Sequence, residues 1–125
     1  MKVVLDAGAL VAIDKRDRPV GAMLHLLQTQ GVPLHTSVAA VAQVWRDGRK
    51  QALLARILAG VKVVGLSTGD ERSIGELLAK ARTSDVANAH VALLVSNGDR
   101  LLTSDTADLQ RLLATKRTSA IIVAV

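Results

Sequence analysis

The chain has 125 residues, half of them apolar and almost none aromatic, which suits one domain with an aliphatic core and excludes a disordered polypeptide. It contains no cysteine, which excludes disulfides, thiolate metal sites and cysteine nucleophiles. The net charge of +5 and the pI near 10.2 favour a polyanionic partner, nucleic acid first, although a solvated basic surface explains the charge equally well. No apolar run approaches the roughly 20 residues of a membrane span, and we see no signal peptide, so we expect a cytoplasmic protein with no membrane partner.

Short apolar runs alternate with longer helical patterns along the whole chain. In chain order, the expected elements are a strand at 2–5, helices at 7–13 and 19–30, a strand at 32–37, a helical segment at 37–60, a strand at 61–66, helices at 68–82 and 83–98, a strand at 100–103, a helix at 105–116 and a strand at 120–125. Pro19 suits a first helical turn, and Ser37 suits a helix cap. We expect a break at Gly48 and a capping box formed by Thr68 with Glu71.

These elements predict an α/β fold. Strands made of continuous valine, leucine and isoleucine, joined by helical crossovers, indicate a parallel sheet covered on both faces. No linker or internal repeat divides the chain. We therefore expect a single domain over residues 1–125, a three-layer α/β/α sandwich around a five-stranded parallel sheet.

Several acidic residues fall where parallel sheets place their functional groups, at the carboxyl ends of strands. Asp6 follows the first strand, Asp105 follows the fourth, Asp108 lies one turn later, and Asp85 opens the helix that leads into the fourth strand. Any one of them can simply cap a helix, an explanation that is weakest for Asp6. Taken together they favour a shared role. Clustered carboxylates repel one another, and oxygen ligands suit Mg²⁺ or Mn²⁺, so the pattern indicates a metal-dependent nuclease.

Four stretches in this order resemble a PIN-domain ribonuclease, in particular a VapC-type toxin of a bacterial toxin–antitoxin pair. They are "VVLDAGAL", "TSVAAVAQVWRDGR", "SDVANAHVALL" and "LLTSDTADLQRLL", and the resemblance covers essentially the whole chain. It implies a PIN-like fold, RNA cleavage by metal-assisted hydrolysis with Mg²⁺ or Mn²⁺, and a cognate antitoxin as partner.

The resemblance also implies a quartet of acids. By position, the first is Asp6 and the fourth is Asp105, often accompanied by Asp108. Gln43 stands where the family typically has a glutamate, and Asn88 where it usually has an aspartate. Asp85 matches an acid that is common in this branch of the family. We accordingly assign catalysis to Asp6, Asp85 and Asp105, and metal binding to these three with Asn88 and Asp108.

The two amides are departures from the family pattern. Gln43 is either a tolerated variant in a supporting role or a plain polar residue on a core helix. Asn88 retains an oxygen ligand but no charge, so we expect a weakened site; Asp85, one turn earlier on the same helix face, can supply charge nearby. The alternative is a catalytically impaired PIN-like module that binds RNA or an antitoxin.

Further residues have two explanations each. Thr103 and Ser104 either cap the following helix or support a carboxylate or a metal-bound water. Arg46, Arg49 and Lys50 form either a solvated helix face or a track for an RNA backbone. We also expect Trp45 in the core and His90 facing away from the acids.

The apolar turns of "MLHLLQTQ" and "LLARIL" predict either a homodimer face or a groove for an antitoxin helix. A phosphoacceptor receiver domain also places acids at strand ends. It requires paired acids after the first strand and a lysine near the last, whereas Asp6 stands alone and "AIIVAV" has no lysine.

Overall fold

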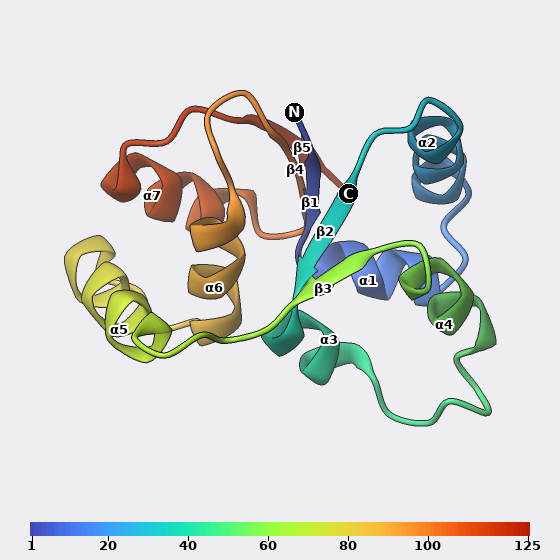
Figure 1. Cartoon of the computed structure of the whole chain (residues 1–125), viewed down its shortest axis with the longest axis horizontal. Helices are drawn as coiled ribbons and strands as arrows, with labels where there is room; N and C mark the ends of the chain where they lie inside the picture. The colour runs from blue at the N-terminus through green and yellow to red at the C-terminus, as the bar shows by residue number, and fades with distance from the viewer.

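A five-stranded parallel sheet forms the middle of the molecule in the computed structural model, which describes residues 1–125. The strands are β1 (Val3–Leu5), β2 (Leu34–Ser37), β3 (Lys62–Val64), β4 (Arg100–Thr103) and β5 (Ile121–Ala124), in the order β3-β2-β1-β4-β5 (Figure 1). All four pairings are parallel, so every strand ends at the same edge of the sheet. The chain order reverses beside β1, which places the ends of β1 and β4 next to each other.

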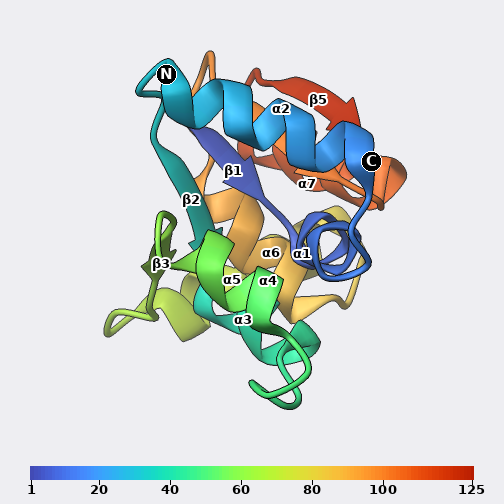
Figure 2. The same ribbon diagram turned by 90° about the vertical axis from the view of Figure 1, so that its right-hand side faces the viewer.

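Seven helices cover the sheet. They are α1 (Ala7–Asp14), α2 (Arg18–Thr29), α3 (Val38–Val44), α4 (Ala52–Leu58), α5 (Asp70–Ala81), α6 (Val86–Leu94) and α7 (Thr106–Lys116). Helices α5, α6 and α7 pack together on one face, whereas α1, α2 and α4 lie on the other (Figures 1 and 2). Helix α3 contacts both α1 and α6 at the end of the sheet where the strands finish. None of these helices has the length and apolar character that crossing a membrane requires.

The core is aliphatic, as the composition indicates. Val3, Val4 and Leu5 are fully buried, and so are Leu101 and Leu102 of the neighbouring strand. Strands covered on both faces in this way have little freedom to move, because close-packed interiors resist displacement. Whatever follows β1 and β4 is therefore held in a fixed place.

The long helical segment expected over 37–60 is two short helices, because the chain leaves the helix at Trp45 rather than at Gly48. Gln51 holds the connecting loop. Its side-chain oxygen accepts from the backbone N–H groups of Arg46 and Asp47, at 2.7 and 3.0 Å, and its amide nitrogen donates to the Val44 carbonyl at 2.9 Å. Ser37 does cap α3, as expected.

The expected capping box of Thr68 with Glu71 is wrong. Helix α5 begins after Gly69, whose φ of +99° is a left-handed conformation that glycine adopts readily. The side chains of Asp70 and Glu71 accept from the backbone N–H groups of Ser67 and Gly69 instead.

Candidate active site at the carboxyl edge of the sheet

Strand register brings Asp6 against Thr103. Leu5 of β1 pairs with Leu102 of β4, so the residues that follow them are neighbours. The Thr103 hydroxyl donates to Asp6 Oδ2, and Thr103 Oγ1 accepts from the Asp105 backbone N–H at 2.8 Å. Thr103 therefore links the first acid to the turn that carries Asp105, so it supports a carboxylate and does not cap α7; Asp105 is the residue that caps that helix.

Asp6 also caps α1, and it is almost completely buried. Its Oδ1 accepts from the Ala9 backbone N–H at 2.8 Å, and the residue is 1% exposed. Burial raises the pKa of Asp6 above its usual value; hydrogen bonds from Thr103, Ala9 and Ser104 oppose this shift, and the nearby charge of Asp105 adds to it. The hydrogen bonds thus hold the Asp6 carboxylate in place, although its ionised form is disfavoured. Protonation or the binding of a cation would stabilise this carboxylate.

Asn88 lies between two carboxylates. It sits in the first turn of α6 and is 5% exposed. Its Nδ2 donates to Asp108 Oδ2 at 2.7 Å and to Asp105 Oδ2 at 3.3 Å. Thr83 donates to the other oxygen of Asp108. A continuous set of polar contacts therefore runs from Asp6 through Thr103, Asp105 and Asn88 to Asp108.

Gly8 explains how closely the turn after β4 approaches α1. A Cβ atom at this glycine would lie 1.7 Å from Ser104 Oγ and 2.5 Å from Ser104 Cβ. Only a residue without a side chain fits, so Gly8 lets Ser104, and with it Asp105, come next to the start of α1. In the "LDAG" stretch the sequence does signal this glycine, but it does not signal its contact nearly one hundred positions away.

Two of the expected site residues make no side-chain to side-chain hydrogen bond with this set. Asp85 caps α6, and its Oδ1 accepts from the Asn88 backbone N–H at 2.9 Å. Gln43 is exposed on α3, and its side chain makes no hydrogen bond, which matches the explanation as a plain polar residue. Nor do any three acidic or histidine side chains converge closely enough to hold a metal ion.

The donor types at this edge nevertheless suit a hard cation, because Asp6, Asp105, Asp108 and Asn88 offer only oxygen ligands. The arrangement does not suit one as it stands. Asn88 turns its amide nitrogen, not its oxygen, toward Asp105 and Asp108. A cation between these two acids would require that amide to turn over.

A buried serine–histidine pair lies at the end of the neighbouring strand. Ser37 Oγ and His90 Nδ1 are 2.6 Å apart, and His90 is 2% exposed. Because Ser37 Oγ already accepts from the Ala39 and Ala40 N–H groups, its own proton points to His90, which stays neutral. Burial lowers the pKa of His90, in agreement. The pair ties α6 to α3, and the separation of 53 positions between its members makes it invisible in the sequence.

The basic residues after α3 lie at the surface. Arg46 donates to the carbonyls of Ala42 and Trp45, Arg49 pairs with Asp47 at 3.3 Å, and Lys50 is exposed and without a partner. Trp45 is not a core residue, contrary to expectation; it is 37% exposed. Because α3 ends at this residue, its ring lies in the loop and not against the sheet.

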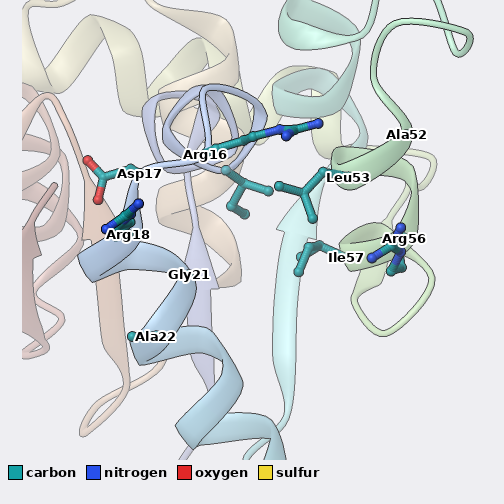
Figure 3. Close-up of a pocket in the computed structure, with 10 residues that line it drawn as sticks. Arg16, Asp17, Arg18, Gly21, Ala22, Ala52, Leu53, Arg56 and Ile57 are labelled. Atoms are coloured by element: carbon teal, nitrogen blue, oxygen red, sulfur yellow. The ribbon is translucent and has the colours of Figure 1, made fainter.

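A pocket of about 570 Å³ opens at the opposite end of α1 (Figure 3). Helix α2 forms one wall and α4 the other, with the end of α1 between them. Its lining is half hydrophobic, and its charged residues are Arg16, Asp17, Arg18 and Arg56. Of the two apolar turns singled out in the sequence, "LLARIL" contributes Leu53, Arg56 and Ile57 to the pocket lining, whereas "MLHLLQTQ" lies further along α2 and contributes no lining residue.

No family model matches the chain, and no curated protein does. Seven chains of solved structures match. One belongs to VapBC2 from Rickettsia felis bound to a DNA fragment from their promoter; it has a TM-score of 0.71 and 17% sequence identity, and the match covers 100% of this chain and 99% of that chain. The fold is PIN-like. The expected three-layer α/β/α architecture is thereby confirmed.

Proposed function

We propose that this protein is a ribonuclease that hydrolyses RNA phosphodiester bonds with the help of Mg²⁺ or Mn²⁺, and that it is the toxin of a toxin–antitoxin pair. One observation carries the proposal: Asp6 and Asp105, at the ends of adjacent central strands, are joined through Thr103 and flanked by Asp108 and Asn88. Asp6, Asp105, Asp108 and the Asn88 oxygen would hold the ion, which would activate water and offset phosphate charge. Asp85, which caps the helix that carries Asn88 and accepts from the Asn88 backbone N–H, completes the proposed catalytic and metal-binding set.

The protein's own part in this reaction is to orient the Asp6 carboxylate, while burial raises its pKa and leaves its charge to be offset by the ion. Three donors surround its carboxylate, while burial keeps bulk water away. The RNA backbone would follow the exposed residues after α3, where Arg49 and Lys50 supply charge and Trp45 offers an aromatic face.

The pocket between α2 and α4 is our proposed seat for the antitoxin. The Rickettsia felis structure with the similar fold is that of VapBC2, which supports a partner of this kind. Three arginines around the pocket favour an acidic, partly apolar partner segment. A second copy of the chain is proposed to cover the edge strand β3, where Val63 and Leu66 are 41% and 55% exposed. Arg56→Glu should weaken the hold on the antitoxin and leave the oligomeric state unchanged.

RNA cleavage tests the function directly. Purified wild type, Asp6→Ala and Asn88→Asp are incubated with a mixed-sequence RNA in Mg²⁺ or Mn²⁺ and in EDTA. We expect metal-dependent cleavage by the wild type, none by Asp6→Ala, and faster cleavage by Asn88→Asp. Equal cleavage by wild type and Asp6→Ala would show that the assigned centre is wrong.

The runner-up is a module that binds RNA or an antitoxin without cleaving. The observation that favours it is the amide nitrogen of Asn88 facing Asp105 and Asp108 where a cation would need an oxygen. No cleavage by any variant, with no Mn²⁺ heat in calorimetry of Asn88→Asp, would support this second function.

A further inference from the structure

We propose that the Asn88 side chain is a built-in substitute for a cation. It holds Asp105 and Asp108 together in the metal-free protein, and, as far as the proposed function holds, a divalent ion enters only by displacing it.

The geometry of the amide carries the first step. A primary amide has two N–H groups, and here the Asn88 nitrogen has two acceptors that belong to different residues. One is Asp108, at 2.7 Å, and the other is Asp105, at 3.3 Å. No other side chain donates to both of these acids. Asn88 is therefore the one neutral side chain that bridges the two carboxylates, in addition to the Asp108 backbone N–H that donates to Asp105 Oδ1.

The two acids that Asn88 bridges carry like charges. Asp105 and Asp108 lie one turn apart at the start of α7, where two like charges on one helix face repel each other. Hydrogen bonds from a neutral donor to a carboxylate are stronger than those between neutral groups. The Asn88 bridge thus offsets the repulsion that a metal ion would otherwise have to offset.

The backbone of Asn88 is fixed, which limits how its side chain can move. The Asn88 N–H donates to Asp85, so the first turn of α6 is fixed and the side chain leaves it in one direction. Turning the amide over is the remaining motion that presents its oxygen to Asp105 and Asp108. That motion breaks both hydrogen bonds, so metal binding competes with the bridge. An aspartate at this position would have no hydrogen to donate, and three carboxylates would then depend on a cation.

Thermal unfolding tests the proposal without reference to cleavage. Melting temperatures of wild type, Asn88→Asp and Asn97→Asp are compared in EDTA and in millimolar Mn²⁺. Asn97 is the matched control: it is exposed, and the oxygen that accepts from the Ser119 N–H at 2.9 Å is kept by an aspartate. The control adds the same charge away from Asp105 and Asp108.

We expect the wild type to melt within about 1 °C in the two conditions, since an ion that must first break the bridge binds weakly, and mass action gives little shift when the ion concentration lies below its dissociation constant. Asn88→Asp should melt about 5 °C lower than Asn97→Asp in EDTA and recover in Mn²⁺, a shift of the size that one lost interaction produces in a small domain. In calorimetry it should bind Mn²⁺ at least about tenfold more tightly than the wild type, because a charged ligand replaces a neutral one.

Two results would overturn the proposal: Asn88→Asp as stable as Asn97→Asp in EDTA, or a wild type stabilised by Mn²⁺ as much as Asn88→Asp. If Asn88→Asp folds in neither condition, Asn88→Ala decides, because it removes the bridge without adding charge. It should melt below the wild type in EDTA and rise in Mn²⁺; an Asn88→Ala variant that matches the wild type in EDTA refutes the bridge. Since only melting and metal binding are scored, a protein that cleaves no RNA would refute the ribonuclease and leave the bridge standing.

Discussion

The charged residues at the two ends of α1 lie in opposite environments, buried at one end and exposed at the other. At its start, Asp6 is buried and accepts from groups fixed by the sheet and the helix. At its far end, about 12 Å away for a helix of eight residues, Arg16 and Arg18 stand in solvent around an open pocket. Buried charge with fixed partners is positioned for one ion or one proton, whereas exposed charge is available to a macromolecule. The helix thus separates the proposed chemistry from the proposed partner contact.

This contrast also interprets the net charge of +5, which by itself does not distinguish between partners. The arginines of the pocket and the basic residues after α3 are different sets of residues, since Arg49 and Lys50 do not line the pocket. The first is suited to an acidic protein segment and the second to RNA. Four experiments test whether the two ends of α1 are as distinct as they look.

The largest effect is expected from Asp6→Asn. Cleavage should fall at least about 100-fold, the upper end of losses seen when groups around a metal are changed. The melting temperature should rise at the same time, by about 4 °C for each kcal/mol of relieved burial and repulsion. Raised pKa values have this sign: stability is greatest where Asp6 is protonated and is lost as the pH rises through the pKa of the folded state.

The control for this experiment is Glu76→Gln, which removes an acid from the exposed face of α5 and should change neither quantity. Cleavage assays and calorimetry provide the measurements. If Asp6→Asn melts below the wild type, the Asp6 charge stabilises the fold. The contrast drawn between the two ends of α1 would then be wrong.

Gly8→Ala is expected to have the next largest effect. The added methyl group collides with Ser104 and should destabilise the fold by about 1–3 kcal/mol, the usual penalty of overpacking. Cleavage should fall as well, because Asp105 follows Ser104. Urea unfolding gives the free energy. Gly75→Ala in α5 meets nothing within 4 Å and should instead stabilise by about 0.5–1 kcal/mol. Equal effects of the two changes would contradict the close approach.

Mild acid should weaken the buried edge and leave the arginine pocket charged. Burial lowers the pKa of His90, so below the ordinary histidine range the unfolded chain binds a proton that the folded chain refuses. The His90 contribution to stability should therefore fall as the pH drops from 7 to 5, whereas the raised pKa of Asp6 contributes with the opposite sign. His90→Asn should reduce the slope of melting temperature against pH without removing it, because the pKa of His35 is lowered too.

His25→Asn, on an exposed part of α2, is the matched control and should keep the wild-type slope. If His90→Asn and His25→Asn gave the same slope, the Ser37–His90 pair would not be the source of the acid sensitivity.

The smallest effect is expected at the surface. Lys50→Ala should weaken RNA binding a few-fold and reduce the salt dependence of the affinity by about one unit, the signature of one lost phosphate contact. Arg56→Ala, in the pocket, should leave both quantities unchanged. RNA-binding titrations at several salt concentrations measure this. A larger loss for Arg56→Ala would place RNA at the pocket and erase the distinction between the two ends of α1.

The sequence predicts the sheet well because its signals are local. Continuous aliphatic runs and the acids that follow them locate β1 and β4, and parallel pairing then brings Asp6 close to Asp105. It fails where the cause is distant. Which atom of the Asn88 amide faces the acids depends on α7, and the Ser37–His90 pair depends on α3 packing against α6. The sequence misplaces Trp45 because Gln51, six residues later, ends the helix earlier than Gly48 suggests.

Helices α6 and α7 are fastened to each other at both ends. Asn88 reaches Asp108 near their starts, and near their far ends the Lys116 ammonium donates to the carbonyls of Ala92, Leu93 and Val95. The two helices should therefore open as one cooperative unit in hydrogen exchange, with matching rates for their slowest amides. An ion or ligand that binds the acids between these helices must therefore reach them through rotation of side chains, since neither helix is free to move aside.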